Sequence, residues 1–301
     1  MVSSVGISMV GGTVADLFRA NDRGNPMNIF ALTNFLGQAS GGLMMGWVGE
    51  KAGFRWCYAV QCIAAAVSVV LNVFVLRETR AEKLLSRRAQ KLTKATGIKH
   101  VCKADLQEHK SFLAVLRVSA LRPLQFLTGE PIVTVLSIWI GFAWAVIYLG
   151  GTATILVFRQ YGFTDGQTGS VQACIGVGAL IGSCTNYHQE YLYRRAAQRS
   201  PTGRAPPEAR LYWAAIGGVL FPLGTMVFAW TGTPNIHWIV PAIMLCISYW
   251  GSYCMYNGVF NYFADAYETY SSSAQAAQGL ARNIMAGIFP LFAHQMASGG
   301  Y

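Results

Sequence analysis

Charged residues are scarce in this sequence of 301 amino acids. Lys, Arg, Asp and Glu make up 12% of it, against about 25% in a typical soluble domain. The shortage is greatest between Arg210 and Asp265, where 54 consecutive residues carry no such side chain. As one helix this run would measure about 80 Å at ~1.5 Å per residue, against ~30 Å for a bilayer core. It must therefore fold back, and the TGTPN sequence at 231–235 supplies a turn, so we predict an integral membrane protein.

Signatures of several other protein classes are also missing. The seven cysteines form no C-x-x-C pair and lie mostly in apolar runs, which predicts neither a disulfide framework nor a metal site. No G-x-S-x-G, H-E-x-x-H or P-loop motif occurs, so we expect no enzyme activity, no cofactor and no ATP-driven pump. The net charge of +10 is not accompanied by a nucleic-acid-binding module, and no channel filter motif is present.

Uncharged runs long enough to cross a bilayer recur along the chain, which predicts an all-α, polytopic membrane protein. A shortened first segment precedes them, and the last run contains one charged residue, Arg282. We therefore expect seven to eight transmembrane helices. The seven complete runs are 24–49, 56–76, 131–158, 166–187, 211–230, 238–264 and 273–296.

Basic links between these runs predict the sidedness of the protein. Twelve of the 23 Lys and Arg residues lie between Arg77 and Arg122, and five more lie between Arg194 and Arg210. Basic links at 19–23, 77–130 and 189–210 alternate with short, weakly basic ones. Because Lys and Arg resist translocation, we expect the basic links to be cytoplasmic, and parity places 265–270 on the same side.

The long basic stretch divides the chain into three parts: 1–77, a central segment 78–130, and 131–301. Within the central segment, Leu84, Leu85, Ala89 and Leu92 share one face of a predicted helix whose remainder is rich in Lys and Arg. Two interpretations fit equally well: a basic amphipathic helix on the cytoplasmic leaflet, or a solvated helical linker.

Several sequences along the chain occur in the order found in one transporter family. GGTVADLFRANDRGNPMNIF at 11–30, RPLQFLTGEPIV at 122–133, WTGTPNIHWIVP at 230–241 and YFADAYETYSSSAQAAQ at 262–278 are examples. They resemble the fungal drug:proton antiporters of the major facilitator superfamily, the twelve-span branch of multidrug and polyamine exporters. The resemblance implies a partial superfamily fold that starts late in family helix 4, ends with helix 11, and lacks helices 1–3 and 12.

The resemblance also implies a function. We expect a secondary transporter that exports small organic compounds, drug-like or polyamine-like cations, in exchange for protons. Its partners would be the lipid bilayer, the substrate and protons, and we expect a monomer in the plasma membrane. The alternative is a fragment, truncated gene model or degenerate relative that inserts into the bilayer without transporting.

Candidate substrate-path residues are the polar side chains inside the apolar runs. Arg282 is foremost, because a charge there costs roughly 2.5–3.5 kcal/mol on insertion scales unless it faces a cavity or partner. Tyr256, Asn257 and Asn261 form the best cluster, since an aromatic ring with amides suits an amphipathic cation. Hydrogen bonding between helices is the alternative role for each of these residues. The remaining candidates are Gln38, Tyr148, Gln172 and Asn283.

Two further sets of residues concern gating and helix packing. Asp16, Arg23 and Asp265 flank predicted cytoplasmic links, where they could form gate ion pairs or simply end helices. Gly37 and Gly41, and likewise Gly42 and Gly46, are four residues apart, a spacing that lets neighbouring membrane helices approach closely. The resemblance places them in the antiporter motif of family helix 5, but Gln38 and Gly42 replace its usual prolines.

Overall fold

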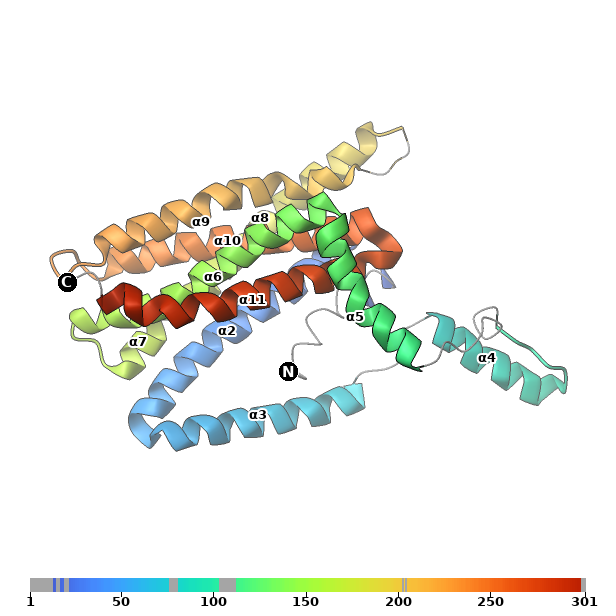
Figure 1. Ribbon diagram of the computed structural model, residues 1–301, viewed down its shortest axis with the longest axis horizontal. Coiled ribbons are helices and arrows are strands. Elements are labelled where there is room, and N and C mark those ends of the chain that lie inside the picture. The colour runs from blue at the N-terminus through green and yellow to red at the C-terminus, as the bar shows by residue number, and fades with distance from the viewer. Residues whose placement is uncertain are drawn as a thin grey trace.

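All regular secondary structure in the described part of the chain is helical (Figure 1). The computed structural model describes residues 13–14, 17–18, 22–75, 81–102, 112–201, 203 and 205–298. The all-α prediction is therefore confirmed. The elements are α2 (Gly24–Ala52), α3 (Phe54–Val75), α4 (Ala81–Thr96), α5 (Phe112–Gly129), α6 (Pro131–Gln160), α7 (Asp165–Val171), α8 (Ala173–Arg199), η3 (Pro207–Leu211), α9 (Tyr212–Thr231), α10 (Ile239–Tyr267), η4 (Glu268–Tyr270) and α11 (Ser271–Ser298).

The predicted spans agree with these helices to within a few residues at most of their ends. Within the described residues, five segments are long and apolar enough to cross a membrane: α3, α6, α7 with α8, η3 with α9, and α10. Helices α2 and α11 have 29 and 28 residues, more than the ~20 needed for a span, but their sequences are more polar. The turn predicted at 231–235 lies in the link between α9 and α10.

Helix α10 lies at the centre of the helix bundle. It contacts α2, α6, α8, α9 and α11, and 61% of its most apolar stretch is buried. Helices α2, α6, α9 and α11 begin at one end of the bundle, and α8 and α10 end there. We call this the basic end. The predicted basic links 19–23, 77–130 and 189–210 all adjoin it.

The link predicted at 189–210 is mostly helix, so the expected span end at Tyr187 was too early. Helix α8 continues to Arg199 because neither glycine nor proline occurs between Tyr187 and Pro201. The extension also buries one face, where Tyr193 and Ala197 pack against Ala205 and Ala209. Residues of this link consequently lie inside the protein.

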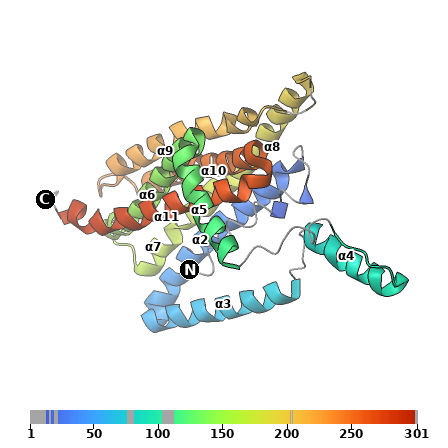
Figure 2. The same cartoon turned by 45° about the vertical axis from the view of Figure 1, so that its right-hand side comes forward.

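Helices α3, α4 and α5 lie at the edge of the bundle. Helix α3 runs from α2 and stands apart from the other helices in both views (Figures 1 and 2). Helix α4 corresponds to the predicted amphipathic helix and projects away from the bundle, with Leu84, Leu85 and Leu92 exposed. Helix α5 was not predicted: the end of segment 78–130 is a helix that contacts α6 and α11.

Candidate functional site

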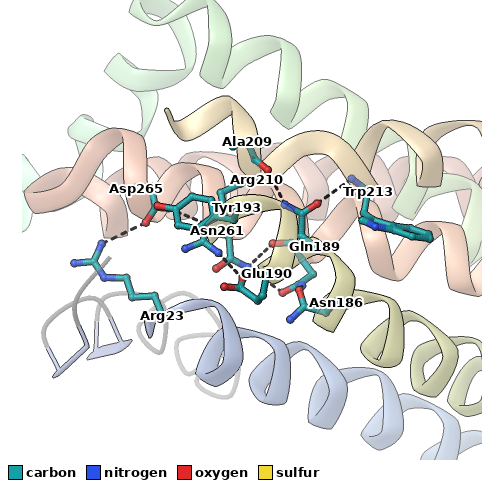
Figure 3. Close-up of polar contacts among 11 residues, drawn as sticks. Arg23, Asn186, Gln189, Glu190, Tyr193, Ala209, Arg210, Trp213, Asn261 and Asp265 are labelled. Atoms are coloured by element: carbon teal, nitrogen blue, oxygen red, sulfur yellow. Dashed lines mark hydrogen bonds and ion pairs between the residues drawn. The ribbon is translucent and has the colours of Figure 1, made fainter. Parts of the chain in front are cut away.

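A group of buried charges occupies the basic end (Figure 3). Arg210 of η3 is 1% exposed and forms ion pairs with Glu190 of α8 and Asp265 of α10. Its Nε lies 2.8 Å from Asp265 Oδ2. One guanidinium thus serves two carboxylates from different helices, which fits its planar arrangement of several donors.

Tyr193 and Gln189 of α8 complete the attachment of η3. The Arg210 guanidinium lies 3.5 Å from the centre of the Tyr193 ring, and the Tyr193 hydroxyl donates to Asp265 Oδ2 at 3.1 Å. Gln189 Nε2 donates to the Ala209 carbonyl, and its Oε1 accepts from the Trp213 backbone N–H. Helices α8, α9 and α10 are therefore fastened together at this end by polar contacts that leave few charges unpaired.

The start of α2 reaches the same charges from the N-terminal side. Arg23 Nη1 lies 3.7 Å from Asp265 Oδ1 and donates to the Ala264 carbonyl at 3.1 Å. A Cβ on Gly24 would overlap Glu190 Oε1, so glycine lets α2 approach this carboxylate. We call this meeting of Arg23 and Gly24 with Asp265 and Glu190 the clamp.

The clamp brings together two of the three predicted gate residues. Arg23 and Asp265 are in contact, while Asp16 lies outside the described residues. Contact between these charges does not establish gating, which stays a prediction.

Asn28, one turn after Gly24, adds neutral contacts to the clamp. Its Nδ2 donates to Ser183 Oγ of α8 at 2.9 Å, and the Tyr253 hydroxyl of α10 donates to its Oδ1 at 2.6 Å. All three side chains are buried.

A second set of polar contacts joins α2 to α7 at the other end of the bundle. Glu50 Oε2 accepts from the Gly166 backbone N–H at 2.6 Å, and Trp47 Nε1 donates to Ser170 Oγ at 2.9 Å. Helix α2 is therefore held by polar contacts near both of its ends.

Two of the four predicted packing glycines lie between these two sets of contacts. A Cβ on Gly46 would lie 2.8 Å from Gly169 Cα, and one on Gly42 would meet the Gln172 side chain. Gly37 and Gly41 face a side of α2 where no described residue lies within 4 Å of such a Cβ. The close helix contact thus uses Gly42 and Gly46.

The predicted cluster of Tyr256, Asn257 and Asn261 is divided between two faces of α10. Asn257 Nδ2 donates to Asn186 Oδ1 of α8 at 2.9 Å, and Asn261 Nδ2 donates to Asn257 Oδ1 at 3.1 Å. Tyr256 instead lies beside Arg282 of α11. Asn257 therefore joins α10 to α8, the alternative that the sequence left open, and Asn261 bonds to Asn257 within α10.

A cluster of aromatic side chains surrounds Arg282, which is 8% exposed. Its Cζ lies 5.0 Å from the Trp144 ring of α6 and 5.9 Å from the Tyr256 ring of α10, close enough for cation–π attraction. Phe35 of α2 packs its ring against both aromatic rings, at 6.1 and 5.9 Å. We call Phe35, Trp144, Tyr256 and Arg282 the aromatic cluster.

The other predicted path residues are scattered. Tyr148 lies next to the aromatic cluster, with its ring 5.9 Å from that of Trp144 and the side chain 48% exposed. Asn283 is exposed, Gln38 is half-buried, and Gln172 packs against Gly42.

Comparison with known proteins identifies the family to which this arrangement belongs. A family model described as Major Facilitator Superfamily matches residues 1–290. The chain belongs to the major facilitator superfamily. It is a multi-pass membrane protein of a family that handles small molecules, as its apolar helices and curated relatives agree.

The superfamily members most similar to the chain include named fungal efflux pumps. It is 34% identical over 292 residues to the MFS-type efflux pump MFS2 of Trichophyton rubrum, covering 96% of this chain and 49% of that protein. It is 34% identical over 300 residues to efflux pump FUB11 of Gibberella moniliformis, covering 99% and 50%. It is 35% identical over 293 residues to the multidrug transporter mdrA of Aspergillus fumigatus, covering 96% and 48%.

The chain spans about half the length of the curated superfamily relatives it matches. No solved structure matches it.

Glu190, Arg210 and Trp144 are among the residues of these sites that were missed from the sequence. Glu190 and Arg210 were assigned to a basic cytoplasmic link, although Arg210 directly precedes the long uncharged run. Trp144 is one aromatic residue among many in its span, and its proximity to Arg282 depends on how α6 and α11 pack.

Proposed function

We propose that the protein acts as a secondary transporter that exports small organic compounds in exchange for protons. The attachment of α2 at both ends, with a close contact of small residues between them, carries this proposal. The efflux activity named for the relatives and the resemblance to drug:proton antiporters support it. A monomer in the plasma membrane, with no enzymatic step, fits the same reading.

The proposed mechanism is a rocking of α2 against α6–α11, so that the two ends of the protein open in turn. At the basic end, Arg23 would move away from Asp265, and Gly24 from Glu190. Asp265 would keep Arg210 and Tyr193, and Glu190 would keep Arg210. Opening would therefore expose Arg23 to water without leaving a buried carboxylate unpaired. The free-energy cost of opening would consequently be low.

The contacts at the other end would alternate with the clamp. Those of Glu50 and Trp47 are hydrogen bonds at the rim, where water can replace the lost partner. The glycine contact of Gly46 with Gly169 lies near them and leaves the helices free to pivot with little side-chain obstruction.

The second candidate is a chain that inserts and folds but does not alternate. One observation favours it: the chain matches only about half of each relative, and the superfamily cycle uses two bundles.

Transport by reconstituted protein separates the two candidates. The chain would be placed in proteoliposomes with an imposed pH gradient, and uptake of one cationic and one anionic fluorescent dye would be measured. We expect proton-dependent uptake of at least one dye above that of empty vesicles. Folded protein, verified by circular dichroism, that gives no such uptake of either dye would support the non-transporting candidate.

A further inference from the structure

The charge of Arg282 bears on the class of compound that the proposed transporter binds, so this inference rests on the proposed function. Among the described residues, no carboxylate forms an ion pair with Arg282, and no backbone carbonyl accepts a hydrogen bond from it. Cation–π contacts with Trp144 and Tyr256 stabilise the guanidinium only partly, since they leave its N–H groups without an anionic acceptor.

The aromatic cluster lies at one depth in the bundle. Phe35, Trp144, Tyr256 and Arg282 come from four helices, and each lies about 16 to 20 Å from the basic end at ~1.5 Å per residue. This depth is near the middle of a ~30 Å bilayer core, where superfamily transporters bind their substrates.

Additional unpartnered polar groups lie beside Arg282. The Tyr256 hydroxyl lies near Arg282 and Asn34 yet makes no hydrogen bond, although the residue is 1% exposed. Gln278 is one turn before Arg282 on the same face of α11, is 1% exposed, and has neither amide atom paired. Buried polar groups without partners are rare in folded proteins and call for an explanation.

We propose that the aromatic cluster binds organic anions once α2 has moved away from α6–α11, with a carboxylate or similar group on Arg282 and a flat apolar body against the rings. A carboxylate accepts two parallel hydrogen bonds from a guanidinium, the geometry for which arginine is suited. The Tyr256 hydroxyl and the Gln278 amide can supply further donors. The rings of Trp144 and Tyr256 are 7% and 1% exposed while Phe35 packs against them, and movement of α2 with Phe35 would uncover them for an aromatic body.

A cationic group would be repelled at this position. It would have to enter a water-poor layer next to Arg282, where like charges interact strongly. This reading differs from the cationic substrates that the family resemblance implies, and the difference can be measured directly.

Binding of three probes of similar shape and different charge tests the proposal. The whole chain in lipid nanodiscs would be titrated with 2-naphthoate, 2-naphthamide and 2-naphthylmethylammonium by isothermal titration calorimetry. We expect the carboxylate to bind on the order of tenfold more tightly than the amide, and the ammonium probe not to bind at this site.

Substitution of Arg282 identifies the site responsible. Arg282→Gln should lower naphthoate affinity by about tenfold or more, and Arg282→Lys should lower it less, because lysine keeps the charge without the paired donors. Arg122→Gln is a matched control: Arg122 also lies over a ring, that of Tyr270, at 5.3 Å, but on α5 at the basic end. It should leave naphthoate binding unchanged.

Three results would overturn the proposal: no naphthoate binding by the folded chain, preference for the ammonium probe, or equal affinity in wild type and Arg282→Gln. If Arg282→Gln loses binding because it misfolds, Arg282→Lys decides instead. The folded Arg282→Lys protein must then bind naphthoate less tightly than the wild type. Proton-dependent uptake of the cationic dye, without naphthoate binding, would leave the transporter proposal standing and remove this one.

Discussion

Arg210 determines how well the basic end holds together, because it pairs with two buried carboxylates at once. Removing it would leave Glu190 and Asp265 buried without their main partner. We predict that Arg210→Met lowers the free energy of unfolding by about 3–5 kcal/mol, the usual cost of breaking a buried ion pair from one side. Thermal and denaturant unfolding of the purified chain in detergent measures this loss.

Arg159 provides the control for that prediction. It pairs with Asp165 at 2.8 Å, but both side chains are more than half exposed. Arg159→Met should therefore change stability by less than ~1 kcal/mol. Equal losses for the two variants would show that burial of Arg210 contributes nothing, and the account of the buried ion pairs at the basic end would have to be given up.

The sequence revealed some of these residues and concealed others. Arg282 and Tyr256 stood out because they are polar side chains inside apolar runs, and the structure places them side by side. Asn257 and Asn261 were equally conspicuous, yet they pair with α8 and with each other. The spacing of residues along a helix predicts on which face of the helix a side chain lies, but the helix packed beside it determines which group the side chain contacts.

At the scale of elements, Gly46 fixes the distance between α2 and α7. A Cβ there would meet the backbone of Gly169 and the Asp165 carbonyl, neither of which can rotate away. We predict that Gly46→Ala lowers the unfolding free energy by about 1–3 kcal/mol, the usual cost of overpacking.

Gly41 is the matched control on the same helix. Nothing among the described residues lies within 4 Å of a Cβ at Gly41, so Gly41→Ala should be neutral or stabilise by up to ~1 kcal/mol through helix propensity. A loss at Gly41 equal to that at Gly46 would contradict the packing assigned to α2. Chemical denaturation of both variants in one detergent makes the comparison.

Helix α4 tests whether the central segment binds lipid. Its exposed leucines and its Lys and Arg residues match the chemistry of an anionic leaflet. We predict that hydrogen exchange at 81–96 slows when phosphatidylserine is added to phosphatidylcholine nanodiscs. Arg87→Glu with Arg88→Glu should abolish the difference. Exchange that is fast and independent of lipid charge would favour the solvated linker.

Helices were the most predictable part of this protein. The lengths of the uncharged runs were enough to predict α6, α9 and α10, because a helix that crosses a bilayer must be continuously apolar. The end of α8 was missed because charge was taken as the limit of the helix, whereas the chain continues helical until Pro201 and buries Glu190. Helix α5 was missed because it belongs to a charged stretch with no apolar run of span length.

On the scale of the whole molecule, membership of the major facilitator superfamily is shown and the transport cycle is proposed. Alternation requires that α2 and α6–α11 separate at one end while they stay together at the other. The clamp and the contacts of Glu50 and Trp47 are the two places where this separation would occur. A chain locked at one of them should bind substrate but not carry it across.

The most direct test of the account is a reversible lock at the basic end. Asn28→Cys and Ser183→Cys would be combined in a background without native cysteines, since these two side chains are hydrogen-bonded across α2 and α8. Proton-driven dye uptake into proteoliposomes would be measured before oxidation, after oxidation and after reduction, with cross-linking verified by mass spectrometry. The account predicts uptake that stops on cross-linking and returns on reduction. Uptake at an unchanged rate by the cross-linked protein, or no uptake by the folded reduced protein, would contradict it.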